Sequence, residues 1–68
     1  MGNEQLAARI RAFRKLKGYT QQSFAIKLGV SLAVLGAVER GTRQPDHKLL
    51  RRITEGLNID MEDLMQIT

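Results

Sequence analysis

Few side chains in this sequence could take part in catalysis or bind a metal ion. His47 is the only histidine and there is no cysteine, so a cysteine-based zinc site is excluded. His47 follows Asp46 at a predicted helix start and has no second ligand at metal spacing. Asp60, Glu62 and Asp63 fall in a predicted first helical turn, where capping and the helix dipole account for acidic residues. We therefore expect a protein that is not an enzyme and that holds no metal and no cofactor.

The basic side chains are concentrated in the first part of the chain, and their chemistry suits phosphate groups. Residues 1–43 contain eight lysines and arginines against two acids, whereas residues 44–68 contain three against five. These balances of +6 and −2 sum to the net charge of +4. Binding to phosphates releases condensed counterions, so a basic face favours a polyphosphate such as nucleic acid. The alternative is a set of solvated charges that only keeps the chain dissolved.

The length and the apolar pattern predict one small all-α domain. A chain of 68 residues has room for one core, and its apolar residues recur at spacings of three and four without any strand pattern. No apolar run reaches the roughly 20 residues of a membrane span, and no signal-peptide pattern is present. We expect a single domain over residues 1–68, folded as a compact five-helix bundle and located in the cytoplasm without contact to a membrane.

Capping residues and glycines divide the chain into five predicted helices. Asn3 caps a helix over residues 4–17, and Thr20 and Gly29 stand around the second helix. Ser31 and Gly41 stand around a third helix, which ends at Arg40. Pro45 or Asp46 opens a fourth helix that stops near residues 56–58, and Asp60 precedes the last. The predicted inward residues are Leu6, Ile10, Phe13, Leu16 or Lys17, Phe24, Ala25, Leu28, Leu35, Val38, Leu49, Leu50, Ile53 and Leu57.

The second and third predicted helices have the spacing of a helix-turn-helix over about residues 20–40. Ala25 is small where the two helices would cross, Gly29 permits a tight turn, and Ser31 caps the third helix two residues later. Val30 and Val38 would hold the third helix against the second. In a helix-turn-helix, the first helix crosses the DNA backbone and the second lies in the major groove. A plain αα-hairpin in a helical bundle is the alternative.

The chain resembles the Cro/cI helix-turn-helix family, also called the xenobiotic-response-element family, which has the fold of the lambda repressor. The resemblance extends from Ala8 to Met65. It rests on Arg14, Thr20-Gln21, Ala25, Gly29-Val30-Ser31, Val38-Glu39-Arg40-Gly41 and Pro45. It implies a transcriptional regulator that binds double-stranded operator DNA as a two-fold dimer, with Gln21 at a phosphate and the third helix reading bases. It also implies a partly buried ion pair between Arg14 and Glu39.

The third helix departs from the family pattern on its predicted outward side. The residues expected to face the groove are Ser31, Leu32, Ala33, Val34, Gly36 and Ala37. Apart from Ser31 they have no hydrogen-bonding side chain, and direct readout of base edges depends largely on such groups. We therefore expect weak sequence discrimination, based on thymine methyl contacts, on Ser31 and on DNA shape.

The same apolar side also fits a second interpretation, a protein-interaction module derived from a DNA-binding domain. Small residues along one stripe of the third helix would let a partner helix come close, and an exposed apolar face of a small domain usually has a partner. Against it stand polar residues placed where phosphates would pass, namely Gln21, Arg40, Arg43 and Lys48. DNA is therefore the favoured ligand.

The last predicted helix contains more apolar residues than one small core absorbs, namely Met61, Leu64, Met65 and Ile67. We expect these residues to form the interface of a homodimer. In the alternative, Met61 and Leu64 complete the core while Met65 and Ile67 fray in solvent.

Overall fold

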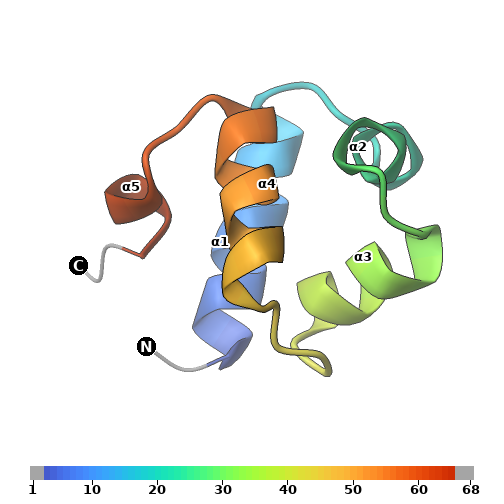
Figure 1. Cartoon of the computed structure of the whole chain (residues 1–68), viewed down its shortest axis with the longest axis horizontal. Helices are drawn as coiled ribbons and strands as arrows, with labels where there is room; N and C mark the ends of the chain where they lie inside the picture. Colours follow the sequence, from blue (N-terminus) through green and yellow to red (C-terminus); the bar gives the residue numbers. More distant parts are fainter. Residues whose placement is uncertain (1–2, 66–68) are drawn as a thin grey trace.

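The computed structural model describes residues 3–65, and in this range the chain forms five α-helices and no strand. They are α1 (Asn3–Leu16), α2 (Gln21–Leu28), α3 (Leu32–Arg40), α4 (His47–Leu57) and α5 (Met61–Met65). The helices α1 and α4 lie side by side at the centre, with α2 and α3 on one side of them and α5 on the other (Figure 1). The predicted all-α bundle is confirmed.

Side-chain caps begin three of the helices at the predicted residues. Thr20 Oγ1 accepts the amide hydrogen of Ser23 at 3.0 Å, and Ser23 Oγ accepts the amide hydrogen of Thr20 at 3.0 Å. Ser31 Oγ accepts the amide hydrogen of Val34 at 3.1 Å, and Asp46 Oδ1 caps α4 in the same way at 2.8 Å. These bonds satisfy amides that have no partner inside the helix. The predicted starts of α2, α3 and α4 are therefore confirmed.

The start and the end of α1 differ from the prediction. Asn3 already belongs to the helix, and its Nδ2 donates to the carbonyl oxygen of Gly41 at 2.7 Å instead of capping. Leu16 or Lys17 was predicted to point inward, but Leu16 is 77% exposed and Lys17 is exposed too. The reason is helical geometry: Leu6, Ile10 and Arg14 follow one another at four-residue spacing and share the inward face, so Leu16 falls outside it.

The turn between α2 and α3 depends on Gly29. Its φ of 72° is left-handed, a conformation that glycine adopts without steric penalty. The chain bends by 113° between the two helices, as in a helix-turn-helix. No single helix within residues 3–65 is long and apolar enough to cross a membrane, and α2 with α3 would qualify only as this bent pair.

The core lies between the helices and contains most of the residues predicted for it. Its buried members are Leu6, Ile10, Phe24, Ala25, Leu28, Leu35, Val38, Leu50, Ile53, Leu57 and Leu64. Phe13 and Leu49 are half-buried against it. Arg9 of α1 fastens α5 to this core, because its Nε donates to the carbonyl oxygen of Leu64 at 2.7 Å and its Nη2 donates to that of Asp63.

Candidate nucleic-acid interface

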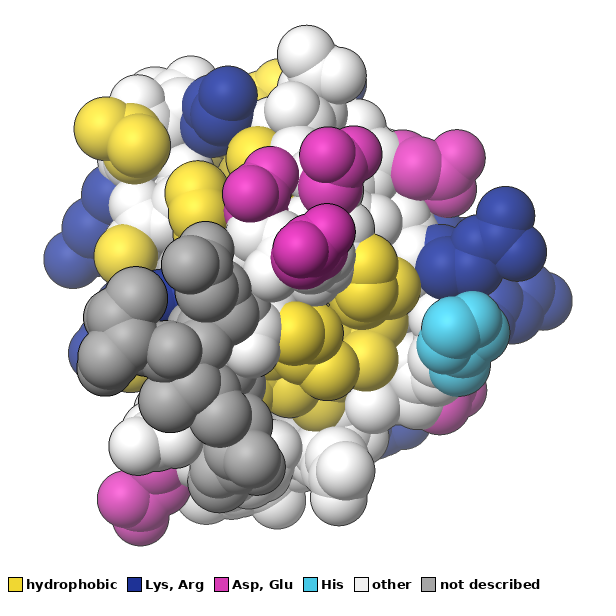
Figure 2. All heavy atoms as spheres, turned by 90° about the vertical axis from the view of Figure 1, so that its left-hand side faces the viewer, with side chains coloured by type: hydrophobic (Ala, Val, Ile, Leu, Met, Phe, Trp, Pro, Cys, Tyr) yellow, Lys and Arg dark blue, Asp and Glu magenta, His cyan; other side chains and the backbone are white. Residues whose placement is uncertain are grey.

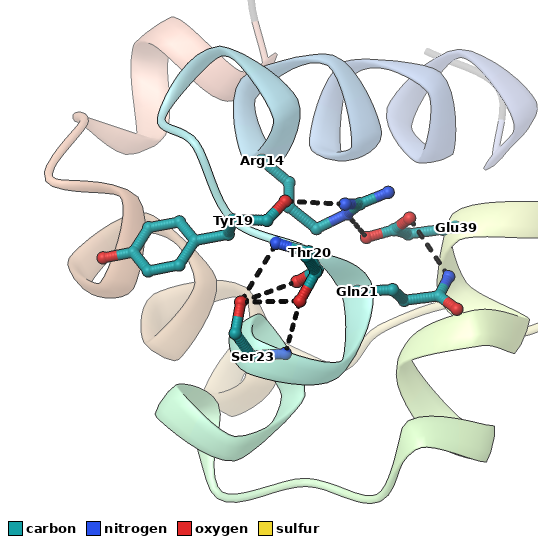
Figure 3. Close-up of polar contacts among 6 residues, drawn as sticks. All are labelled: Arg14, Tyr19, Thr20, Gln21, Ser23 and Glu39. Atoms are coloured by element: carbon teal, nitrogen blue, oxygen red, sulfur yellow. Dashed lines mark hydrogen bonds and ion pairs between the residues drawn. The ribbon is translucent and has the colours of Figure 1, made fainter.

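A buried ion pair joins α1 to α3 beneath the start of α2. Arg14 Nε lies 2.7 Å from Glu39 Oε2, and the two residues are 7% and 3% exposed. Arg14 Nη1 also donates to the carbonyl oxygen of Tyr19 at 2.9 Å, in the loop before α2. Figure 3 shows Glu39 between Arg14 on one side and Gln21 on the other. The pair therefore sets the position of α3 relative to α1 and to the loop before α2.

Glu39 also holds the side chain of Gln21, the first residue of α2. Gln21 Nε2 donates to Glu39 Oε1 at 3.3 Å (Figure 3). A glutamine amide has two N–H groups, so this bond leaves one donor for a ligand. One buried carboxylate thus orients both Arg14 and Gln21. The sequence placed Gln21 beside the turn but did not indicate this bond.

The outer face of α3, defined here as Leu32, Ala33 and Ala37, is apolar. Leu32 is 48% exposed, Ala33 is exposed and Ala37 is half-buried. Val34 is half-buried on one flank of this face. Gly36 was expected to be available on this side of the helix, but it is buried, because two side chains cover it.

Arg40 and Gln21 cover Gly36. A Cβ atom at position 36 would lie 3.0 Å from Arg40 Nη1 and 3.9 Å from Gln21 Oε1. The guanidinium of Arg40 therefore lies back along α3, next to the amide of Gln21. These two residues are called the first donor cluster below.

Arg43 and Lys48 lie at the opposite flank of the outer face. Both line a hollow that also touches Ser31 and Val34 at the start of α3. A helix turns about 100° per residue, so Gly36 and Val34 stand on opposite sides of Ala33 and Ala37. Ala33 and Ala37 thus lie between the first donor cluster on one side and Arg43 and Lys48, the second donor cluster, on the other.

Arg52 lines the same hollow and was not among the residues that the sequence analysis selected. The available signal was its spacing of four residues from Lys48, which places both side chains on one face of α4. That signal is weak, because Arg51 stands beside Arg52 in the sequence and only the hollow itself distinguishes the two.

One of the residues predicted for a dimer interface is not available for it. Leu64 is fully buried in the core of its own chain, so it cannot serve as an interface residue. Met61 is half-buried against the core and Met65 is 39% exposed, while Ile67 lies outside the described residues. Leu64 is buried because α5 is docked onto α1 and α4. Figure 2, which views the α5 side, shows hydrophobic side chains beside a group of acidic ones.

Comparisons with known proteins relate this geometry to regulators. A family model described as helix-turn-helix matches residues 10–64. An uncharacterized HTH-type transcriptional regulator of Bacillus subtilis, YazB, is 52% identical over 56 residues, which cover 82% of this chain and 81% of the relative.

Two solved structures share the fold. The restriction-modification controller protein C.AhdI from Aeromonas hydrophila has a TM-score of 0.89 and 27% identity, covering 93% of this chain and 96% of its own. The clp gene regulator ClgR from C. glutamicum has a TM-score of 0.87 and 32% identity, covering 93% of this chain and 82% of its own. The family match includes α2 and α3, which carry the first donor cluster, and also the loop after α3 and the start of α4, which carry the second.

Proposed function

The chain belongs to the helix-turn-helix family of transcriptional regulators, which are not enzymes, and we propose that it binds double-stranded DNA with α3 in the major groove. One observation carries the proposal: Ala33 and Ala37 on the exposed face of α3 lie between side chains on both flanks that could donate to phosphates. A helix in the major groove has a sugar-phosphate strand on each side, so it needs donors on both flanks.

The two donor clusters position the domain on the duplex. Gln21 and Arg40 contact the phosphates of one strand, while Arg43 and Lys48 contact those of the other. Such contacts fix register and orientation but carry no sequence information directly. Glu39 supports the first cluster, because its bond to Gln21 restrains the amide and uses only one of its two N–H groups.

Base contacts come from the outer face of α3 and from Ser31. Leu32, Ala33 and Ala37 meet the groove through methyl groups, which distinguish thymine from cytosine only weakly. Gly36 does not contribute while Arg40 covers it. The domain therefore discriminates sequences mainly through thymine methyl groups and DNA shape.

Two copies bind together as a two-fold dimer through the α5 side. The exposed side chain of Met65 and the half-buried one of Met61 support this pairing. A dimer presents two α3 helices about 34 Å apart, one DNA turn, so two weakly specific half-sites combine. Sedimentation should give a dimer for the intact chain and a monomer for Met65→Glu. A monomer for the intact chain at high micromolar concentration would exclude the dimer. Truncation after Asp63 is unsuitable, since it would remove Leu64 from the core.

A charge placed on the outer face of α3 tests the docking geometry. Ala33→Glu puts a carboxylate where the proposal places the groove, and Ala8→Glu makes the same change at an exposed position of α1. Ala33→Glu should lower the affinity for duplex DNA at least about tenfold, because the new carboxylate repels the nearby phosphates. Ala8→Glu should bind nearly as the unchanged chain does. Equal affinities for the two variants would show that α3 does not enter the groove.

The protein-interaction module makes the opposite prediction for the same surface. If the outer face of α3 docks a protein, the unchanged chain has no salt-dependent affinity for duplex DNA. Ala33→Glu then has no DNA binding to reduce. The apolar composition of that face favours this alternative, and the donors on both flanks favour DNA.

A further inference from the structure

A hollow beside the start of α3 gathers more positive charge than the second donor cluster alone. It has a volume of about 310 Å³ and lies between the N-terminal ends of α3 and α4. Its basic residues are Arg43 from the loop, and Lys48 and Arg52 from successive turns of α4. Three cations from two segments of the chain therefore face one space.

The charge of these three side chains is not neutralised by the described part of the chain. Its one ion pair is that of Arg14 with Glu39, and Arg43, Lys48 and Arg52 donate no side-chain hydrogen bond there. Asp46 also lines the hollow, but its Oδ1 already accepts the amide hydrogen of Leu49. Three cations and one carboxylate leave a balance of +2, so Asp46 offsets only part of the positive charge in the hollow.

The walls of the hollow strengthen its field. Val30, Val34 and Leu49 are apolar, and low-dielectric walls concentrate the field of nearby charges. Ser31 and Asp46, the N-caps of α3 and α4, both line the hollow, so the positive ends of two helix dipoles meet there. Two helix starts and three cations together favour an anion that offers several oxygen atoms.

We propose that this hollow is a phosphate-binding site in which Arg52 joins Arg43 and Lys48. The part of this inference that concerns DNA rests on the proposed function. On DNA, the site holds a backbone phosphate and extends the footprint from α3 to the second turn of α4. A free phosphorylated molecule offers the same chemistry, and the experiment separates the two sources.

The chain provides a matched control next to Arg52. Arg51 is an exposed arginine on the same helix and does not line this hollow; it lines a second one, with His47, Lys48, Arg52 and Glu55. Arg51→Gln and Arg52→Gln therefore remove the same charge and have the same effect on helix propensity. Only Arg52→Gln removes a cation from the proposed site.

The first measurement uses inorganic phosphate and the amide resonances of the intact chain. In NMR spectra, phosphate should change the amide chemical shifts of Val34 and Leu49 until they saturate, whereas chloride at equal ionic strength should not. Those shifts should persist in Arg51→Gln and weaken clearly in Arg52→Gln. The second measurement is the affinity for a duplex at several salt concentrations. Arg52→Gln should lower the affinity about eightfold at about 0.1 M salt. It should also reduce the magnitude of the salt slope, the slope of log affinity against log salt concentration, by about 0.9. Arg51→Gln should change both quantities much less.

The possible results distinguish a backbone phosphate from a free phosphorylated molecule. They also distinguish failure of the phosphate site from failure of the proposed DNA binding. Loss of DNA affinity confined to Arg52→Gln supports a backbone phosphate. Saturable phosphate shifts that depend on Arg52, with equal DNA affinities for the two variants, support a free phosphorylated molecule. If the unchanged chain binds no duplex, the proposed function fails and the phosphate shifts alone decide this inference. No saturable shift, together with equal behaviour of the two variants on DNA, overturns it.

Discussion

Removing the carboxylate of Glu39 should destabilise the domain far more than removing an exposed one. Glu39 is 3% exposed, and its loss leaves the buried guanidinium of Arg14 without its counter-charge. Breaking a buried pair in this way costs roughly 3 to 5 kcal/mol. The bond from Arg14 Nη1 to the carbonyl oxygen of Tyr19 remains, so we expect a loss near the lower limit, about 3 kcal/mol.

A loss of this size is a large share of the stability of a 68-residue domain. This loss should lower the midpoint of thermal unfolding by about 15 °C. Circular dichroism measures the midpoint. Glu62→Ala is the control, because Glu62 is exposed and in the described residues forms no ion pair. Its free energy of unfolding should stay within about 1 kcal/mol of the unchanged chain.

A double substitution separates the loss of charge pairing from the loss of packing. Replacing both partners, as Arg14→Met with Glu39→Leu, removes the pair without leaving a charge buried. Such replacements are often neutral or stabilising, so the double variant should be more stable than Glu39→Ala. Equal midpoints for Glu39→Ala and Glu62→Ala would refute this reasoning, because a buried unpaired guanidinium cannot be neutral in its effect.

Further predictions concern two glycines and two donors. Gly36→Ala should stabilise the domain by about 1 kcal/mol, because alanine favours the helix and the new Cβ meets only the flexible end of Arg40. Gly56→Ala should destabilise it by about 1 kcal/mol in the same urea titration, since its Cβ would lie 2.9 Å from Leu28 Cδ2 in the core; effects of the same sign would contradict this difference. Gln21→Ala and Arg43→Ala should weaken binding to every duplex sequence by similar factors, and only the arginine change should reduce the salt slope by about one unit. A loss confined to one sequence would mean that Arg43 reads a base.

Local rules predicted most of the fold. The hydroxyls of Thr20 and Ser31 and the carboxylate of Asp46 cap helices because their own neighbours supply the amides, which requires no knowledge of the rest of the chain. Gly29 is predictable for the same reason, since two helices so close in sequence need a left-handed residue between them.

Features that depend on distant parts of the chain were not predictable in this way. Leu64 and Met65 are adjacent in sequence, but only the docking of α5 on α1 and α4 decides that Leu64 is buried and Met65 exposed. Gly36 was expected to face outward, and Gln21 from α2 covers it together with Arg40. Arg51 and Arg52 look alike in the sequence, and only the tertiary structure places Arg52 alone of the two at the hollow beside the start of α3.

The most direct test of the central claim is a titration of labelled mixed-sequence duplex DNA with the intact chain at about 50 and about 200 mM salt. Arg40, Arg43 and Lys48 on phosphates give a salt slope of about −2.7 per subunit, so the affinity should fall about 40-fold between the two conditions, and further if Arg52 contributes. Absence of binding at the lower salt concentration, or an affinity that does not change with salt, would contradict the proposal that α3 docks on DNA between two phosphate strands.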